Sequence, residues 1–370
     1  MTAIQPCSIP DAVHKTGYHS LFAKSISIYA QHAYFRAMKY LPLLLFVLCL
    51  ACNNTATPGK QSAKDSVLYT PLILPLTDSI LQFPDNAALY FRRALLLFNT
   101  DPALAQADFE KAAALQPTVT DHWAGAGEAA LVTEHYKEAG AYFEKALQTA
   151  PANSYLQYRL AMAWIEIKQY NRADSLAARM EKTTDGYAQA FYLKARIAED
   201  HQDTAQAITH LKAAVAKAGA QSEFEAVMEL ADLLRARRNA EAVKYYEMAF
   251  RQDPTNADPL YDMAQYYQEQ GKQKEATFTY KRCIEADPGY AAAYIALGKQ
   301  ELQQQQWKPA LNYFTLAAKA QPTDAEAYYY RGMCYEQLGN KTAARDDYSK
   351  ALTFRKSYPE AGTALERVKQ

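Results

Sequence analysis

Apolar residues recur at helical spacing along most of the chain, and the stretch YKEAGAYFEKALQTAP, Tyr136 to Pro151, illustrates the pattern. Its apolar positions lie three or four residues apart, as on one face of an amphipathic helix. The stretch also ends on a proline and carries alanines where the core face of a helix would usually carry leucines. A helix over these residues is therefore predicted to pack closely against a neighbour.

Alanine recurs along the chain at an interval of 34 residues, with a single interval of 35, at Ala105, Ala139, Ala173, Ala207, Ala242, Ala276, Ala310 and Ala344. Four residues after each alanine lies a larger residue, with one exception, at Phe109, Phe143, Ala177, Leu211, Tyr246, Tyr280, Phe314 and Tyr348. A sustained internal period of this length is typical of stacked helix pairs.

Prolines follow the same period, at Pro84, Pro117, Pro151, Pro254, Pro288 and Pro322. Where the period predicts two more prolines, the chain has Asp185-Gly186 and Gly219, which also interrupt helices. Because proline ends a helix and begins a turn, these positions predict the boundaries between successive repeats.

The period and its small-x3-aromatic spacing resemble the tetratricopeptide repeat family, whose pattern is W-x2-L-G-x2-Y followed by A-x3-F and a proline. Residues of the first half of the pattern stand at Trp123, Ala126 and Gly127, at Leu160, Ala161 and Trp164, at Tyr294, Leu297 and Gly298, and at Tyr328, Gly332 and Tyr335. The resemblance covers eight repeats from about Asn86 to Tyr358, with a half repeat before them and a terminal helix from Pro359 to Gln370. It implies an all-α fold, a right-handed α-solenoid of helix-turn-helix repeats.

The choice of small residues has a physical reason that does not depend on the family. The first helix of each repeat must lie close to the second helix, so one contact point on it has room only for glycine or alanine. A larger side chain there would overpack the crossing at a cost of about 1–3 kcal/mol. The predicted contact points are Gly127, Ala161, Ala195, Gly298 and Gly332.

The first helices of successive repeats are expected to line a concave surface. The positions predicted to point into it are mostly aromatic or methionine, and the candidate partner-binding residues are Phe91, Tyr158, Tyr192, Met228, Tyr261 and Tyr329. Tyrosine gives a large contact area at low entropic cost, which suits recognition of a peptide. The alternative is that these side chains only pack between adjacent first helices. Some members of the family that this chain resembles bind carboxyl-terminal peptides through a cluster of lysine, asparagine and arginine at these positions. This chain has no such cluster there, which argues against that mode of chaperone binding.

The amino-terminal part of the chain is predicted to be a targeting segment. The sequence from Met38 reads MKYLPLLLFVLCLAC, in which the apolar run is too short to span a bilayer but suits a cleaved secretory signal. The stretch Cys49-Leu50-Ala51-Cys52 resembles the lipobox of bacterial lipoproteins, which makes Cys52 the predicted lipidation site. A Cys-x-x-Cys redox pair is the alternative, but no βαβ pattern surrounds these cysteines.

These features divide the chain into four predicted parts. Residues 1–37 are an upstream extension that is not part of the fold, with translation beginning at Met38. Residues 38–51 are the lipoprotein signal peptide, residues 52–76 a flexible tether, and residues 77–370 the solenoid. The expected location is the periplasmic face of a bacterial outer membrane, reached through a lipid at Cys52.

Charge and reactive side chains narrow the possible functions. The chain has 40 basic and 40 acidic residues, so it lacks the positive surface that binds nucleic acid. The seven histidines have no metal-ligand spacing, and no cofactor or metal is expected. Cys283 and Cys334 are predicted to lie too far apart for a disulfide and to be buried as small apolar residues.

The predicted function is that of a membrane-anchored, non-catalytic scaffold that binds a protein or peptide partner of unknown identity. One alternative is an envelope protein that binds cell-wall glycan or peptide, for which tyrosine stacking would also serve. Another is a cytosolic chaperone adaptor, which requires that Cys52 stays unprocessed. An enzyme is not expected, because the repeats leave no stretch long enough for a catalytic domain.

Overall fold

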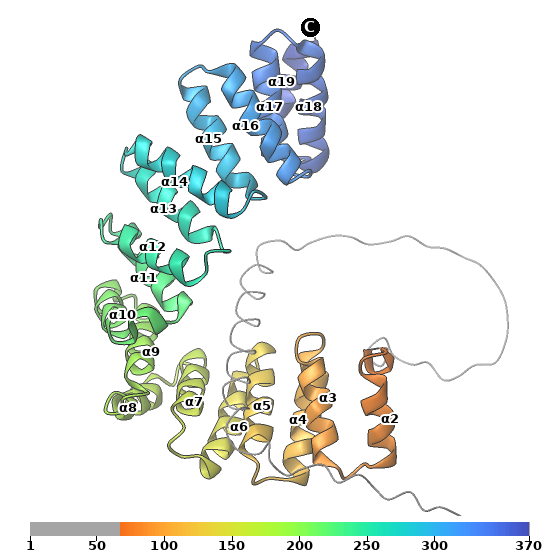
Figure 1. The fold of residues 1–370 in the computed structure, drawn as a ribbon, viewed down its shortest axis with the longest axis vertical. Coiled ribbons are helices and arrows are strands. Elements are labelled where there is room, and N and C mark those ends of the chain that lie inside the picture. The colour runs from red at the N-terminus through yellow and green to blue at the C-terminus, as the bar shows by residue number, and fades with distance from the viewer. Residues whose placement is uncertain (1–66, 370) are drawn as a thin grey trace, which may run out of the picture. The chain divides into compact units, whose positions relative to one another are not determined.

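The computed structural model describes residues 67–369, which form eighteen α-helices and no β-strand (Figure 1). The predicted all-α class is therefore confirmed. The described residues divide into two compact units, which lie within Met1–Gln169 and Tyr170–Gln370. The predicted extension, signal peptide and lipidation site Cys52, with most of the tether, lie outside the described residues.

The described part of the first unit contains six helices in which each helix packs on the one before it, from α2 to α7. They are α2 (Leu74–Gln82), α3 (Ala87–Leu97), α4 (Pro102–Leu115), α5 (Thr120–Val132), α6 (Tyr136–Thr149) and α7 (Ser154–Glu166). Helix α2 begins three residues before the boundary that the sequence predicted for the solenoid, so residues 74–76 are helical.

The second unit contains twelve helices, again packed in the order of the chain. They are α8 (Tyr170–Met180), α9 (Tyr187–Asp200), α10 (Thr204–Ala218), α11 (Phe224–Ala236), α12 (Ala242–Gln252), α13 (Asp258–Glu269), α14 (Gln273–Ala286), α15 (Ala291–Gln303), α16 (Trp307–Ala320), α17 (Ala325–Gln337), α18 (Lys341–Phe354) and α19 (Pro359–Lys369). A short 3-10 helix, η2 (Gly219–Gln221), follows α10.

The helices end where the sequence predicted. Each of the six periodic prolines lies two residues beyond the last residue of a helix, as Pro151 does after α6 and Pro322 after α16. The residue before a proline is driven away from helical dihedrals, which explains the position of these ends. The two predicted breaks without proline are also present, since Gly186 precedes α9 and Gly219, with φ of 56°, follows α10.

The turn between the two helices of a repeat contains one residue with left-handed backbone dihedrals. Seven turns share this feature, at Glu134, Lys168, Gln202, Arg238, Gly271, Gln305 and Gly339. Only two of these seven residues are glycines, although glycine adopts this conformation at the lowest cost. The tight turn therefore carries some backbone strain in most repeats.

The periodic alanines form the centre of the helix packing. All eight, from Ala105 to Ala344, have no exposed surface, and the side chains four residues after them are likewise buried. A Cβ added to Gly298 would lie 2.6 Å from the ring of Phe314, and one added to Gly127 would lie 2.8 Å from the ring of Phe143. Close packing of small first-helix residues against second-helix aromatics is thus confirmed.

The core extends from repeat to repeat within the second unit. One cluster of buried side chains runs from Ala195 on α9 to Leu297 on α15. A second cluster continues it on α15 to α17, and a third joins α17, α18 and α19. No repeat encloses a core of its own, which is the expected behaviour of a quasi-one-dimensional array.

Candidate functional site

The six side chains predicted to bind a partner form the first-helix row. In the first unit it contains Phe91 on α3 and Tyr158 on α7, and in the second unit Tyr192 on α9, Met228 on α11, Tyr261 on α13 and Tyr329 on α17. Tyr158 is buried, with 6% of its surface exposed, and the other five are half-buried. Five of the six therefore keep some surface available for contact.

Three members of the row contact an aromatic side chain at the start of the next first helix or of the terminal helix. The ring of Phe91 lies 5.2 Å from that of His122, the ring of Tyr261 lies 5.1 Å from that of Tyr290, and the ring of Tyr329 lies 5.0 Å from that of Tyr358. Such pairs contribute about 0.5–1.5 kcal/mol beyond the area that they bury. These rings therefore help to join repeats, and their role in partner binding stays a prediction.

Charged side chains one helical turn beyond the row are also used to connect repeats. Glu128 on α5 has 1% of its surface exposed and receives two bonds from the guanidinium of Arg159 on α7, at 2.8 and 2.5 Å. Burial alone would lower the pKa of Arg159, but the Glu128 carboxylate raises it above its ordinary value. In the second unit Arg196 pairs with Glu229, and Lys299 with Glu326.

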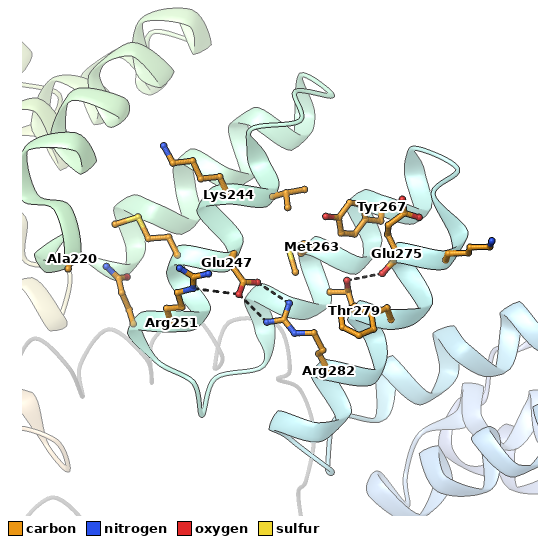
Figure 2. A pocket seen from close by; sticks show the side chains of 14 residues that line it. Ala220, Lys244, Glu247, Arg251, Met263, Tyr267, Glu275, Thr279 and Arg282 are labelled. Atoms are coloured by element: carbon orange, nitrogen blue, oxygen red, sulfur yellow. Dashed lines mark hydrogen bonds and ion pairs between the residues drawn. The ribbon is translucent and has the colours of Figure 1, made fainter.

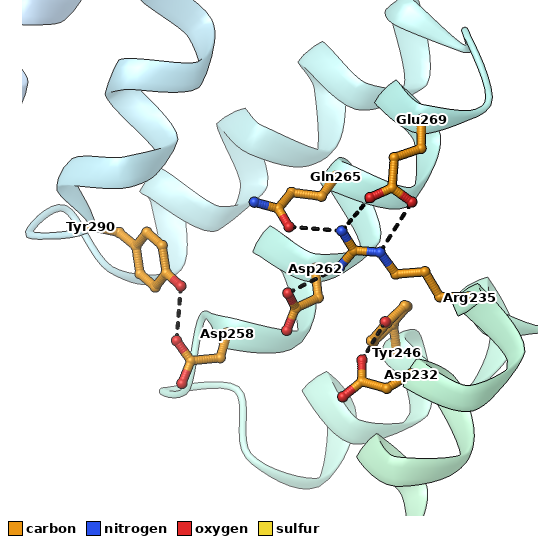
Figure 3. Close-up of polar contacts among 8 residues, drawn as sticks. All are labelled: Asp232, Arg235, Tyr246, Asp258, Asp262, Gln265, Glu269 and Tyr290. Carbon is orange, nitrogen blue, oxygen red and sulfur yellow. Dashed lines mark hydrogen bonds and ion pairs between the residues drawn. The ribbon is translucent and has the colours of Figure 1, made fainter. Parts of the chain in front are cut away.

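The most extensive of these connections joins α11 to α13 (Figure 3). Arg235 donates to Asp262 at 3.3 Å, to Gln265 at 2.9 Å and to Glu269 at 2.5 Å. Beside it, the hydroxyl of Tyr246 donates to Asp232 at 2.5 Å. Burial and then the Asp232 charge raise the pKa of the Tyr246 hydroxyl, which stays protonated at neutral pH.

Sequence reasoning did not predict these pairs, although their spacing is visible in the chain. The partners stand about one repeat apart, as Glu128 and Arg159 do, or Arg235 and Glu269. Opposite charges separated by one period face each other when first helices stack. This spacing was the signal that could have identified them.

Sequence reasoning also missed a groove in the second unit, with a volume of about 1100 Å³ (Figure 2). The groove has walls formed by α12 and α14 and a floor formed by Met263 and Tyr267 of α13. These two residues lie two positions after Tyr261 and Gln265, which places them on the opposite side of the helix from the first-helix row. The groove and the row are therefore separate surfaces.

The largest exposed apolar side chain of the groove is Phe278 on α14, with 65% of its surface accessible. The equivalent position, two residues after the periodic alanine, is small or polar in every other repeat. The residues there are Ala107, Ala141, Ser175, Thr209, Lys244, Asn312 and Asp346. An aromatic residue at this position was the sequence signal for the groove.

The described residues contain few groups suited to catalysis or metal binding. Between residues 67 and 369 no cluster of three histidine, cysteine, aspartate or glutamate side chains could hold a metal ion. Cys283 and Cys334 are buried free thiols, as predicted, and burial raises the pKa of each to about 12. Burial also lowers the pKa of His122 and of His210.

Among residues 67–369, no helix combines the length and the apolar character needed to cross a bilayer.

Helix pairs stacked through small residues, with one core shared between neighbours, define an α-solenoid repeat protein. A family model described as tetratricopeptide repeat matches residues 95–154, 192–257 and 295–362, and a second model with that description matches residues 133–197 and 233–300. The first of these models covers more than half of the chain. The chain belongs to the tetratricopeptide repeat family.

Curated relatives match parts of the chain. The tetratricopeptide repeat and J domain-containing co-chaperone DNJ1 of Fusarium oxysporum f. sp. lycopersici is 33% identical over 86 residues, which are 23% of this chain and 16% of that protein. Hsp70-Hsp90 organizing protein 1 of Glycine max is 25% identical over 188 residues, 48% of this chain and 32% of that protein. The matched region spans less than a third of the length of each curated relative.

Two solved structures are similar over part or most of the chain. A monomeric mutant of IFIT1 with Gppp-AAAA covers 72% of this chain and 71% of its own, with 16% identity and a TM-score of 0.41. The MamA protein covers 46% of this chain and 92% of its own, with 19% identity and a TM-score of 0.39.

Proposed function

We propose that the chain is a non-catalytic scaffold that binds a peptide segment of a partner protein along the part of the first-helix row that lies within one unit. The observation that supports this most is the composition of the row within each unit, where aromatic and methionine side chains keep part of their surface exposed. The charged side chains beside the row form ion pairs with residues of neighbouring repeats. A partner is therefore expected to contact this face mainly through apolar side chains. Membership of the tetratricopeptide repeat family supports protein binding in general.

We propose that the scaffold does not bind its partner through the carboxylate at the partner's carboxyl terminus. One of the relatives, Hsp70-Hsp90 organizing protein 1 of Glycine max, makes a chaperone adaptor the natural alternative. A carboxylate clamp needs cations that are available to the ligand. On this face Arg196 lies 3.2 Å from Glu229, and Lys299 is paired with Glu326, so both cations already have carboxylate partners.

The scaffold is further proposed to be held by a lipid at Cys52 on the periplasmic face of a bacterial outer membrane. The support is the sequence Cys49-Leu50-Ala51-Cys52 after a short apolar run. Labelling with a tagged fatty acid should mark the wild-type chain and fail to mark Cys52→Ser. Equal labelling of both chains would contradict Cys52 as the lipidation site, and absence of label on the wild-type chain would favour the cytosolic adaptor.

The partner can be found by crosslinking and mass spectrometry in the native envelope, and its binding can then be measured with variants of the full chain. Met228→Ala should weaken binding about 10-fold, since a central apolar contact carries that much of the affinity. Phe278→Ala lies on the opposite side of the repeats and should leave binding unchanged. Unchanged binding in Met228→Ala would contradict the proposal, as would an equal loss in both variants.

A partner of a different class would be revealed by digestion of the cell wall. Pull-down of the native chain before and after peptidoglycan digestion separates a protein partner from a glycan. A partner that is lost only after digestion would favour the cell-wall alternative.

A further inference from the structure

The groove between α12 and α14 has apolar surface at its base and on both walls, with Val243 and Met248 on the α12 side. Met263 is almost fully buried beneath it, Tyr267 is half-buried, and Phe278 stands 65% exposed on the α14 side. The volume of about 1100 Å³ exceeds the 300–1,000 Å³ of most small-molecule sites. The groove therefore has room for a peptide segment.

The charges around the groove are predominantly positive. Its lining contains Lys244, Arg251, Lys274 and Arg282, against the two carboxylates of Glu247 and Glu275. Glu247 is already held between two guanidinium groups, with Arg282 at 2.9 and 3.1 Å and Arg251 at 3.6 Å (Figure 2). The bond from Arg282 links the two walls, because Glu247 lies on α12 and Arg282 on α14.

The two lysines of the groove are available to a ligand. Lys244 lies on the α12 wall and Lys274 on the α14 wall, and both are exposed. Neither makes an ion pair with another residue of the described range 67–369. The Lys244 ammonium lies 5.1 Å from the centroid of the Tyr245 ring, so its contact is with an aromatic face and not with a carboxylate. A segment lying in the groove would therefore have apolar surface beneath it and, on each side, an exposed lysine without a carboxylate partner.

We propose that this groove binds an acidic amphipathic segment of a partner protein. The apolar side chains of the segment would cover Met263, Tyr267 and Phe278, and its carboxylates would lie near Lys244 and Lys274. Charge complementarity selects this occupant, since Glu247 already pairs with Arg251 and Arg282, and a basic segment would place like charges against the two exposed lysines. The site is distinct from the first-helix row and gives the scaffold a second surface for a partner.

The test uses the full chain and a panel of synthetic amphipathic peptides of about 15 residues, long enough to form a helix on binding. Leucine or phenylalanine occupies positions i, i+3, i+4 and i+7, and the remaining positions are either glutamate or lysine. Fluorescence anisotropy should show that glutamate peptides bind at least about 10-fold more tightly than lysine peptides. Increasing salt should reduce this preference, because exposed charges are screened.

Two variants and one matched control locate the binding. Phe278→Ala should weaken binding of the glutamate peptides at least about 10-fold, as expected for the loss of a central aromatic anchor. The double variant Lys244→Glu/Lys274→Glu should reverse the preference toward lysine peptides. Phe354→Ala removes another exposed phenylalanine, 43% accessible on α18, and should change nothing.

The proposal is overturned if no peptide of the panel binds, if lysine peptides bind as tightly as glutamate peptides, or if Phe278→Ala behaves like Phe354→Ala. Its failure is distinguishable from failure of the proposed scaffold function. Peptides that lose affinity with Met228→Ala but keep it with Phe278→Ala would occupy the first-helix row. That result would refute the groove and leave the scaffold proposal standing.

Discussion

The close packing of first-helix glycines against second-helix aromatics makes Gly298→Ala a direct test of the fold. The added Cβ would lie 2.6 Å from two ring atoms of Phe314, well inside an ordinary contact of 3.4–4 Å. Phe314 is fully buried, so its ring cannot swing into solvent. Overpacking of this kind costs about 1–3 kcal/mol. Alanine gains about 1 kcal/mol over glycine in a helix, which leaves a net loss of about 0–2 kcal/mol.

Gly362→Ala on α19 provides a matched control for helix propensity. No atom outside the surrounding turn lies within 4 Å of a Cβ added there, so this variant should gain stability by about 1 kcal/mol. The difference between the two variants then isolates the packing cost. Equilibrium denaturation of the full chain, combined with amide exchange of α15 and α16, measures both effects. Equal stabilisation by the two substitutions would refute the packing argument.

Three further predictions follow from other parts of the second unit. Gly339→Ala should lower stability by about 1 kcal/mol, because φ is +81° and no neighbour is near enough to add a contact effect. Tyr261→Ala should lower stability by about 1–3 kcal/mol, since the ring packs against two tyrosine rings of the array. Burial first, and then the neighbouring Glu229, raise the pKa of Glu199 from 4.5 to about 8. The folded state therefore binds this proton more tightly, stability falls as pH rises from 4.5 toward 8, and Glu199→Gln should be spared that loss.

Each of these predictions has a result that would contradict it. Thermal denaturation of Gly339→Ala should show a lower melting temperature, and an unchanged value would mean that the turn adapts without strain. A stability of Tyr261→Ala within 0.5 kcal/mol of wild type would favour a role in partner binding over packing. For Glu199→Gln the stability gain over wild type should be larger at pH 8 than at pH 5, and an equal difference at both values would refute the assignment.

The repeat could be predicted from sequence because its determinants are local and periodic. The alanine of each repeat, such as Ala139 or Ala276, is small for the same steric reason. The recurrence of alanine at one period was therefore enough to predict how the helices pack in every repeat. The inter-repeat pairs were not predicted, because the partner of a charge depends on how helices one period apart face each other. The groove was not predicted because Phe278 differs from the small or polar residues at the same position of the other repeats. A comparison that looks for shared residues does not detect a residue that occurs in one repeat only.

Charged side chains are paired on the first-helix side and exposed in the groove between α12 and α14. This difference explains why we propose apolar contacts with a partner on the first face and charged contacts on the second. On the first-helix side, carboxylates and guanidiniums such as Glu128 and Arg159 are held together across repeats, so a partner would have to break a buried pair to use them. Breaking a buried pair from one side costs about 3–5 kcal/mol, which exceeds what a replacement contact would return. On the groove side, Lys244 and Lys274 are exposed and can meet a carboxylate at no such cost. A partner that is discriminated by charge should therefore depend on the groove, and a partner bound through the first-helix row should be nearly insensitive to salt.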